Sequence, residues 1–290
     1  GAAVATTYNN LYLDARKELR QAGVEAAQLE ARELLCYASE KTRNQFFRDR
    51  NLYVSDHVER RFRELMDRRL AGEPVAYIIG EWEFYGLTLD ICRDVLIPRA
   101  DTETLVDRGI VFVKDLPDGT RVLDLCAGSG CVGLAVAANC PNTRVILADW
   151  SEDALRVCRQ NIRRCELTAQ VSAARANALE PAPAALWDFD LILCNPPYIP
   201  TGDLAGLDHS VRDYEPMLAL DGGEDGLDFY RAVTAGWKSA LRPGGKLAFE
   251  VGYDQAPAVE YIMAGQGYED IQTFQDPGGH WRVVEGVLNE

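Results

Sequence analysis

The stretch RVLDLCAGSGCVGLAVAANCPNTRVILADW, residues 121–150, decides the fold of this 290-residue chain. The apolar run RVLDLCAG predicts a buried strand, CVGLAVAANC a helix and TRVILADW a second strand. Strands that alternate with helices in this way form parallel sheets with the helices on their faces. The stretch therefore predicts an α/β protein.

The same alternation continues toward the C-terminus. Ser151 is placed to cap a helix over 151–165, with Glu152 and Asp153 in its first turn. Segments 270–275 and 281–288 are two strands with no helix between them, so they are expected to pair antiparallel. Further strands are predicted over 170–176, 189–194 and 245–252, and helices over 226–241 and 254–267. Together these segments predict a seven-stranded, mostly parallel, doubly wound sheet of the Rossmann-like kind.

The first eighty residues show a helical pattern instead. Apolar residues recur at helical spacing in three segments, until Gly72 and Pro74 end the third. The stretch YIIGEWEFYGLTLDICRDVLIP is rich in aromatic and β-branched residues, and Gly86 within it is a turn signal, which predicts a hairpin. We therefore expect a helical domain over 1–76, a β-hairpin linker over 77–98 and the α/β domain over 99–290.

The chain is strongly acidic, with a formal net charge of −15 and a sequence pI of about 4.7. Such a surface repels phosphate backbones, so direct binding of nucleic acid is not expected. One predicted helix carries a basic face, which we interpret as a solvated face paired with Glu59, Glu64 and Asp67 of the same helix. Its arginines are Arg60, Arg61, Arg63, Arg68 and Arg69.

The cysteines and histidines predict no metal site. The eight cysteines form no C-x-x-C pair and the three histidines stand apart, whereas zinc sites need clustered ligands. No run of eighteen or more apolar residues predicts a membrane span, and residues 1–10 lack the pattern of a secretory signal. We expect a cytoplasmic enzyme with reduced thiols.

A glycine loop follows the strand that ends at Asp124 and Leu125. In a doubly wound sheet, ligands bind outside the carboxyl ends of the strands, and Gly128 and Gly130 let the backbone approach a ligand closely. Asp149 ends the next strand about 20 residues further on, where a carboxylate can accept hydrogen bonds from ribose hydroxyls. D-x-x-x-G-x-G followed by such an acid favours a methyltransferase loop over the alternatives, a dinucleotide site or a tight turn without a ligand.

The strand over 189–194 runs into Asn195-Pro196-Pro197-Tyr198. Two consecutive prolines remove two backbone donors and hold the preceding residues in extended geometry, which leaves carbonyl oxygens in the cleft as acceptors. The Asn195 side chain adds an acceptor and Tyr198 adds a flat wall. The segment suits an –NH2 group on a planar system, and the alternative is a rigid turn with no ligand.

The chemistry of such a nitrogen explains why acceptors matter. An amide or aniline-like nitrogen is a poor nucleophile because its lone pair is delocalised. Hydrogen bonds from its N–H groups to Asn195 Oδ1 and the Pro196 carbonyl would favour the positive charge that develops on nitrogen. They would also aim the nitrogen at the sulfonium methyl of S-adenosylmethionine, and such positioning contributes roughly 7–11 kcal/mol at most. The segment therefore predicts methyl transfer to an amide-type nitrogen.

These residues together resemble the release-factor glutamine N5-methyltransferases, the HemK/PrmC-type family. The resemblance covers essentially the whole chain and is carried by GEPVAYIIGEWEFYGL (72–87), VLIPRADTETLVD (95–107), NPPYIP (195–200) and VRDYEPMLALDGGEDGLDFYR (211–231). It implies an N-terminal helical bundle, a β-hairpin linker and a seven-stranded class I methyltransferase domain. It also implies that the substrate is the glutamine of the GGQ motif in peptide-chain release factors, which the bundle helps to dock.

The resemblance further implies a role for individual residues. Asn195, Pro196, Pro197 and Tyr198 hold the glutamine amide, with Asn195, Pro196 and Tyr198 as the catalytic residues. Two positions depart from the family pattern, since Cys126-Ala127 replaces the commoner Gly-Thr and Asn177 stands where an Asp is usual. The implied cofactor residues begin with the loop Cys126, Ala127, Gly128, Ser129 and Gly130. Asp149 is implied to hold the ribose, with Trp150 beside it, and Asn177 and Ala178 to contact the adenine edge. Asn195 also contacts the cofactor, and Pro98 and Arg99 lie near its amino-acid end.

Three rival functions remain open. A glutamine methyltransferase of a ribosomal protein shares the NPPY core, although the segment 72–87 favours the release factor. A DNA adenine-N6 methyltransferase needs a basic groove and base flipping, and the acidic composition counts against it. The third rival is a catalytically silent protein that docks on release factors, and the intact NPPY and Asp149 argue against it.

Overall fold

The structure, a computed structural model, describes residues 5–290 of the chain. The chain forms two compact units, one of Gly1–Gly80 with His209–Tyr214 and one of Glu81–Asp208 with Glu215–Glu290. Residues 1–4, with which the predicted helical domain begins, lie outside the described residues. The two units are described separately.

The first unit is helical, as the spacing of its apolar residues predicted. Its core is built from side chains with almost no exposed surface, among them Leu19, Leu34, Phe62 and Met66. Each large apolar side chain that is fully buried contributes about 1.5–3 kcal/mol, which allows helices of modest length to form a stable bundle. The helices of this unit are α1 (Tyr8–Gln21), α2 (Ala27–Ser39), α3 (Arg43–Arg48), α4 (Asp56–Leu70), α5 (Val75–Ile79) and α9 (His209–Arg212).

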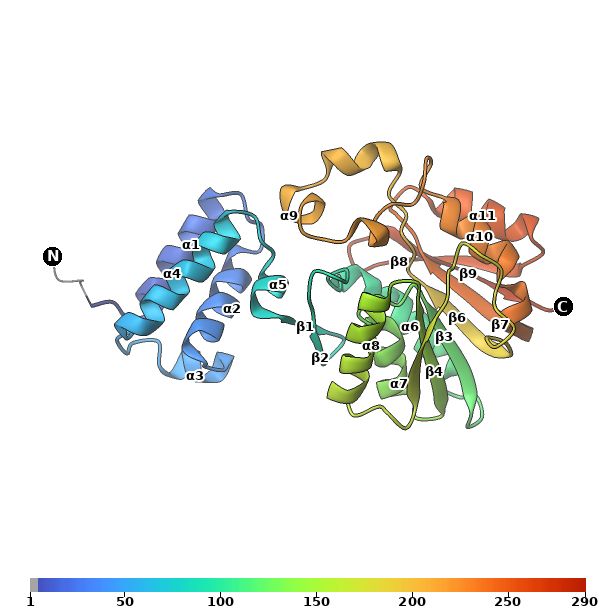
Figure 1. Ribbon diagram of the computed structural model, residues 1–290, viewed down its shortest axis with the longest axis horizontal. Coiled ribbons are helices and arrows are strands. Elements are labelled where there is room, and N and C mark those ends of the chain that lie inside the picture. The colour runs from blue at the N-terminus through green and yellow to red at the C-terminus, as the bar shows by residue number, and fades with distance from the viewer. Residues whose placement is uncertain (1–4) are drawn as a thin grey trace. The chain divides into compact units, whose positions relative to one another are not determined.

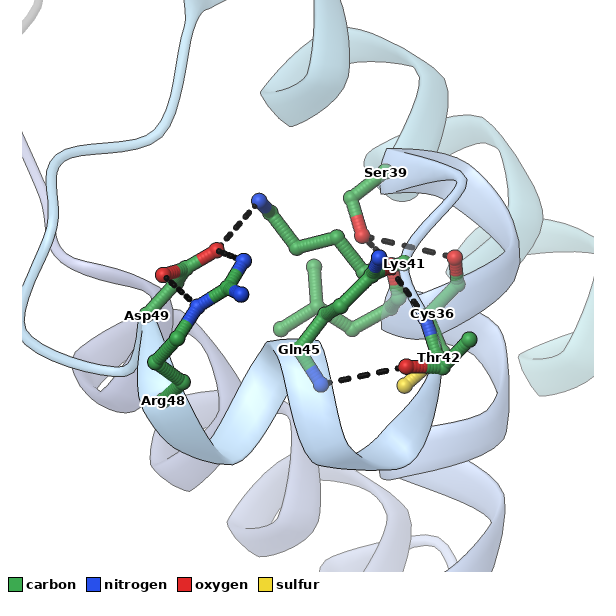
Figure 2. Close-up of polar contacts among 8 residues, drawn as sticks. Cys36, Ser39, Lys41, Thr42, Gln45, Arg48 and Asp49 are labelled. Carbon is green, nitrogen blue, oxygen red and sulfur yellow. Dashed lines mark hydrogen bonds and ion pairs between the residues drawn. The ribbon is translucent and has the colours of Figure 1, made fainter.

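Helix α3 was not predicted, and local polar contacts hold it at both ends (Figure 2). At its start, Thr42 Oγ1 accepts a hydrogen bond from Gln45 N at 3.1 Å, and Gln45 Oε1 accepts one from Thr42 N at 2.9 Å. At its end, the Asp49 carboxylate accepts from Arg48 Nε at 3.0 Å and from Lys41 Nζ at 2.8 Å. These hydrogen bonds hold the pKa of Asp49 well below its usual range. A helix of six residues needs such support, because helix nucleation alone is unfavourable.

The region around residue 77 differs from its prediction. An extended segment was expected from Tyr77, but residues 75–79 form the short helix α5, between Pro74 and the left-handed Gly80. Its first four residues, 75–78, are buried in the helical unit, and such packing overrides a preference for extended structure. The hairpin follows, with β1 (Glu81–Phe84) antiparallel to β2 (Leu87–Asp90). Tyr85 and Gly86 both have positive φ at its turn, as a two-residue type I′ turn requires.

Two arginines of α4 pair with carboxylates of other helices. Arg63 lies 3.0 Å from Glu18 of α1, and Arg69 forms an ion pair with Glu30 of α2. The predicted pairing within the helix is found between Arg63 and Asp67, which are 3.8 Å apart. The basic face therefore connects helices of its own unit.

The second unit contains the predicted seven-stranded sheet, in the order β5-β4-β3-β6-β7-β9-β8. Neighbouring strands from β5 to β7 are parallel, whereas β9 is antiparallel to both β7 and β8. The predicted antiparallel pair at the end of the chain is thus confirmed. The strands are β3 (Thr120–Leu125), β4 (Thr143–Asp149), β5 (Val171–Arg175), β6 (Phe189–Cys194), β7 (Leu241–Glu250), β8 (Glu269–Gln275) and β9 (Trp281–Leu288).

Helices cover both faces of this sheet (Figure 1). On one face, Gly109 brings its helix so close to the sheet that an added Cβ would lie 3.0 Å from Leu193. On the other face, Trp237 and Phe249 are fully buried in a cluster of apolar side chains. The first face carries α6 (Glu103–Val113), α7 (Cys131–Asn139) and α8 (Glu152–Arg164), and the second α10 (Asp228–Gly236) and α11 (Ala256–Gly265). Short 3-10 turns are η1 (Ala100–Thr102), η2 (Thr201–Gly206), η3 (Met217–Ala219) and η4 (Lys238–Ala240).

The strand order reverses between β3 and β6. From β3 the chain proceeds outward to β4 and β5, then returns to β6 on the other side of β3. Doubly wound sheets bind ligands at this switch point, outside the carboxyl ends of the strands. None of the helices described between residues 5 and 290 is long and apolar enough to cross a bilayer.

Candidate active site

A cavity of about 490 Å³ lies at the carboxyl ends of β3, β4 and β6, within the second unit. Of the predicted site residues, twelve line it: Pro98, Arg99, Cys126, Ala127, Gly128, Ser129, Asp149, Trp150, Asn177, Ala178, Asn195 and Pro197. Gly130, Pro196 and Tyr198 are not among the lining residues. The structure therefore brings together most of the predicted cofactor residues with the first residue of the NPPY segment.

The glycine loop after β3 takes a left-handed backbone at three positions. Cys126, Gly128 and Gly130 have φ of 64°, 57° and 86°. Gly130 has a second constraint, because an added Cβ would lie 2.7 Å from a methyl carbon of Leu147. Gly130 therefore lets the loop pack closely against Leu147, and Gly128 exposes its backbone to the cavity.

Asp149 at the end of β4 ties this loop to the neighbouring strand. Its Oδ2 accepts a hydrogen bond from Gly128 N at 2.9 Å, and its Oδ1 accepts one from Ser151 N at 3.0 Å. Burial raises the pKa of Asp149, and the backbone donors oppose that rise. Each carboxylate oxygen has a second lone pair, so both can accept a further hydrogen bond from a ligand hydroxyl.

Two buried residues that were not assigned from the sequence, Asp124 and Asn161, form hydrogen bonds next to the glycine loop. Asp124 is fully buried and accepts a hydrogen bond from Gly133 N at 2.8 Å, and burial raises its pKa to about 7. Asn161 of α8 donates to the Ser129 carbonyl at 2.9 Å and to the Asp90 carbonyl at 3.1 Å. The spacing within D-x-x-x-G-x-G marks Asp124, but no local pattern marks Asn161.

The wall that precedes α6 is anchored by a buried carboxylate. Glu215 is 5% exposed, forms a bidentate ion pair with Arg99, and accepts a hydrogen bond from Ile97 N at 2.9 Å. Arg99 reaches the cavity from this position, beside the buried Pro98. Glu215 explains one part of the segment 211–231, which had no assigned role.

Asn177 and Ala178, which were predicted to lie at the adenine edge, lie in the loop after β5. Asn177 Oδ1 accepts a hydrogen bond from Leu179 N at 3.0 Å, which forms a local turn at the cavity. Ala178 is buried, whereas Trp150 is about half exposed and carries the Arg175 guanidinium 4.0 Å from its ring centroid. These residues form the outer wall of the cavity.

Tyr198 lies behind the cavity, against a buried carboxylate. Its hydroxyl donates to Glu250 Oε2 at 3.4 Å, and Glu250 Oε1 accepts from Thr102 Oγ1 at 2.6 Å. Thr102 lines the cavity. Burial raises the pKa of Glu250 to about 7, against the opposing effects of Thr102 and Arg282. Glu250 thereby connects the aromatic residue of NPPY with the cavity wall.

The backbone of the NPPY segment is packed by glycines of the segment 211–231. A Cβ on Gly222 would lie 2.7 Å from the Tyr198 Cα, and one on Gly226 would lie 2.5 Å from the Tyr198 carbonyl oxygen. The same carbonyl accepts a hydrogen bond from Gln255 Nε2 at 2.8 Å. Contacts on several sides thus hold Tyr198 in place.

The chemical character of the site follows from these residues. The cavity offers carboxylate, amide and backbone groups beside apolar walls. No cluster of three or more metal-binding side chains occurs among residues 5–290. A seven-stranded sheet of this order, with a glycine loop and an acidic strand end at one cavity, defines the class of S-adenosylmethionine-dependent class I methyltransferases.

Comparison with known proteins narrows this class to a family. Residues 10–80 match the PrmC N-terminal domain family and residues 102–206 the methyltransferase small domain family. A release factor glutamine methyltransferase of Geobacter sulfurreducens is 40% identical over 275 residues, 94% of each chain. The Moorella thermoacetica enzyme of that name is 39% identical over 278 residues, 96% of this chain and 97% of its own. The chain belongs to the release factor glutamine methyltransferase family.

A solved structure shares the fold at lower identity. A methyltransferase from Pyrococcus furiosus is 19% identical, with a TM-score of 0.52, and the match covers 78% of this chain and 99% of that one. The expected fold class, a seven-stranded class I methyltransferase domain with N-terminal helices, is confirmed. The chain is a methyltransferase.

Proposed function

We propose that this chain transfers the methyl group of S-adenosylmethionine to N5 of the glutamine in the GGQ motif of peptide-chain release factors. The observation that carries the proposal is that Asn195 and the glycine loop Cys126–Ser129 line one cavity. A methyl donor on the loop and an amide at Asn195 would therefore share one space. The names of the relatives from Geobacter sulfurreducens and Moorella thermoacetica support the choice of substrate.

The residues at the loop fit the cofactor. Ser129 Oγ is buried, lines the cavity and has no hydrogen-bond partner among the described residues. A buried polar atom of this kind costs stability unless a partner satisfies it, and the amino-acid end of the cofactor offers such partners. Asp149 holds the ribose hydroxyls through lone pairs that Gly128 and Ser151 leave available. The other proposed cofactor residues are Pro98, Arg99, Cys126, Ala127, Gly128, Gly130, Trp150, Asn177, Ala178 and Asn195.

The substrate amide is held by Asn195, Pro196, Pro197 and Tyr198. Asn195 Oδ1 and the Pro196 carbonyl accept its two N–H groups, which orients the nitrogen and disperses the positive charge that forms on it. We assign the aromatic wall beside the amide to Tyr198, whose hydroxyl donates a hydrogen bond to Glu250 Oε2 at 3.4 Å. S-adenosylmethionine supplies the electrophilic methyl, so the protein needs no nucleophile of its own.

The partner is a protein and not a nucleic acid. We assign docking of the release factor to the helical unit, with the catalytic residues in the second unit, and we place the activity in the cytoplasm, where these factors act. The net charge of −15 disfavours direct contact with nucleic acid.

The test is mass spectrometry of unmethylated release factor after incubation with enzyme and S-adenosylmethionine. We expect the mass of one added methylene on the peptide with the GGQ glutamine, and on N5 of that residue. Asn195→Ala should lower kcat by roughly 10²–10³-fold, the usual cost of losing one group aimed at developing charge, with an unchanged thermal unfolding midpoint. Methylation of duplex DNA or of a ribosomal protein, with the release factor unmodified, would overturn the proposal.

A further inference from the structure

Cysteines surround the glycine loop. Cys126 belongs to the loop, and Cys131 begins the helix that follows it; both line the cavity. Cys158 of α8 donates a hydrogen bond through its Sγ to the Gly128 carbonyl at 3.1 Å. Cys194 is the last residue of β6 and has no exposed surface. Neither the proposed binding of the cofactor nor the proposed methyl transfer uses these thiols.

Two of the four thiols are neighbours across the centre of the sheet. Leu125, the last residue of β3, pairs directly with Cys194 of the parallel strand β6, and Cys126 is the residue that follows β3. Cys126 packs against the side-chain cluster that contains Cys194. After burial, the neighbouring Cys126 is the next cause that raises the pKa of the Cys194 thiol. Side chains offset by one residue in regular strands point to opposite faces of the sheet, but Cys126 lies past the end of β3 with φ of 64° and does not follow that alternation. Adjacent strands lie about 4.8 Å apart, so the two Cα atoms are separated by roughly the 4.4–6.8 Å that a disulfide spans.

The two cysteines differ in access. Cys126 is half-buried and lines the cavity, whereas Cys194 does not line it, so a small oxidant that enters the cavity reaches Cys126 first. Cys194 is enclosed, and burial raises the pKa of its thiol well above the usual value. Cys126 is therefore the thiol that reacts first, and Cys194 the one that reacts second from within the protein.

We propose that Cys126 and Cys194 form an oxidation site, which a hydroperoxide closes to a disulfide and which thereby shuts the cofactor cavity. This inference rests on the proposed cofactor site, because it concerns the regulation of that site. The oxidant is named by its class, and hydrogen peroxide is its simplest member.

The chemistry takes two steps. In the first, the sulfur of Cys126 attacks one oxygen of the peroxide, the O–O bond breaks, and the products are a sulfenic acid and water. In the second, the sulfur of Cys194 attacks the Cys126 sulfur, the S–O bond breaks, and the Cys194 proton leaves with the hydroxide as a second water. Two thiols are oxidised, one peroxide is reduced, and atoms and electrons balance.

The disulfide affects both the cofactor loop and the segment that begins with Asn195. A disulfide brings the two sulfurs to about 2.05 Å, well inside the separation of two thiols in contact. Cys126 begins the loop whose Gly128 is tied to Asp149, and Cys194 directly precedes Asn195. A displacement of about 1 Å at such a site costs on the order of 10²-fold in rate. The disulfide therefore lowers both cofactor affinity and methyl transfer, and a dithiol restores them.

The experiment uses the full chain, reduced and then treated with hydrogen peroxide. Peptide mapping without reductant should find Cys126 linked to Cys194. Isothermal titration with S-adenosylhomocysteine should show at least a tenfold loss of affinity, which dithiothreitol reverses. Prior saturation with S-adenosylhomocysteine should slow the linkage, because the ligand covers Cys126.

Two variants distinguish oxidation of the Cys126–Cys194 pair from oxidation of other cysteines. Cys194→Ala should abolish the linkage, and dithiothreitol should no longer restore what peroxide removes. Cys36→Ala, in the helical unit, should respond to peroxide as the parent does. Each variant is compared with its own untreated form.

Three outcomes overturn the proposal. They are a linkage of Cys126 to Cys131 or Cys158 in place of Cys194, a Cys126–Cys194 disulfide that leaves S-adenosylhomocysteine affinity unchanged, and irreversible oxidation without any disulfide. If the reduced chain does not bind S-adenosylhomocysteine at all, the cofactor site itself is wrong, and the peptide map then reports on the thiol pair alone.

Discussion

Asp149 meets both the backbone of the glycine loop and the proposed ribose. Its oxygens accept from Gly128 N and Ser151 N, so a substitution removes a support of the loop as well as a ligand contact. A hydrogen bond to a charged group contributes about 1.5–3 kcal/mol. Asp149→Ala should therefore weaken S-adenosylhomocysteine binding by roughly 10- to 100-fold, measured by isothermal titration.

A ligand without the ribose hydroxyls separates the two roles of Asp149. The 2′,3′-dideoxy analogue of S-adenosylhomocysteine should bind the parent weakly and lose little more affinity in Asp149→Ala, because the interaction is already absent. If the substitution weakens both ligands equally, Asp149 supports only the loop and the assignment to the ribose fails.

Glu250 gives the site a pH dependence of known sign. Burial raises its folded-state pKa from 4.5 to about 7, so the folded protein binds this proton more tightly than the unfolded chain does. The stability contributed by the protonated form is complete below about pH 4.5 and is lost as pH rises through about 7. The loss amounts to roughly 3 kcal/mol at most, at 1.36 kcal/mol for each pKa unit.

Glu250→Gln should remove this loss. The difference in unfolding midpoint between the variant and the parent should shift in favour of the variant as pH rises from about 5 to about 8. Asp124, whose pKa burial also raises to about 7, is common to both proteins and cancels in the comparison. Thermal unfolding at several pH values measures the effect, and parallel curves for the two proteins would contradict the assignment.

Residue motifs made part of the site predictable. Asp149 and Asn195 each end a strand within a short pattern, and parallel strands bring their carboxyl ends to one edge of the sheet. Glu250 lies 52 residues from its partner Tyr198, and Glu215 lies 116 residues from Arg99. Their roles depend on burial and on contacts from distant segments, which no local spacing encodes. Gly128, Gly130 and Gly133 also satisfy the G-x-G-x-x-G spacing of dinucleotide sites, so the loop needs the NPPY segment beside it to indicate its class.

At the scale of elements, the glycines of the segment 211–231 pack against the backbone of the NPPY segment, to which we assign the substrate amide. Gly222 leaves no room for a Cβ, because the nearest atoms are the Tyr198 Cα at 2.7 Å and carbonyl carbon at 2.8 Å. These backbone atoms of Tyr198 cannot move aside as easily as the end of a flexible side chain. Gly222→Ala should therefore displace Tyr198 and lower kcat for the release factor by at least about tenfold.

Gly202 provides the matched control. It lies in η2, and an added Cβ there meets nothing within 4 Å. Gly202→Ala should keep the kcat of the parent, and both variants should bind S-adenosylhomocysteine as the parent does. Equal activities for the two variants would show that Tyr198 tolerates displacement.

Long, strongly patterned elements were predictable, and short ones were not. The apolar runs of β3, β4 and β6 predict buried strands, and the structure has them within three residues at either end. Helix α5 carries the composition of a strand but becomes helical because Pro74 and Gly80 bound it and the helical unit buries its side chains. Helix α3 depends on a capping box and a partly buried ion pair between Lys41 and Asp49, which are visible only when their partners are placed.

At the scale of the whole molecule, the residues of the cavity all belong to one unit. They lie between Arg93 and Phe229 and outside His209–Tyr214, which groups with Gly1–Gly80. The helical unit is matched by its own family, over residues 10–80. Binding of the cofactor and recognition of the protein substrate should therefore be separable.

A chain of residues 81–290 tests this separation. It should bind S-adenosylhomocysteine within about threefold of the parent, because every residue that lines the cavity is kept. Methylation of a short GGQ peptide should persist, whereas kcat/KM for intact release factor should fall by at least tenfold, since a lost docking surface costs affinity at about 1.4 kcal/mol per decade. The shortened chain must first show a cooperative thermal transition. An equal fall for peptide and release factor would mean that the helical unit supports the catalytic unit and does not dock the substrate.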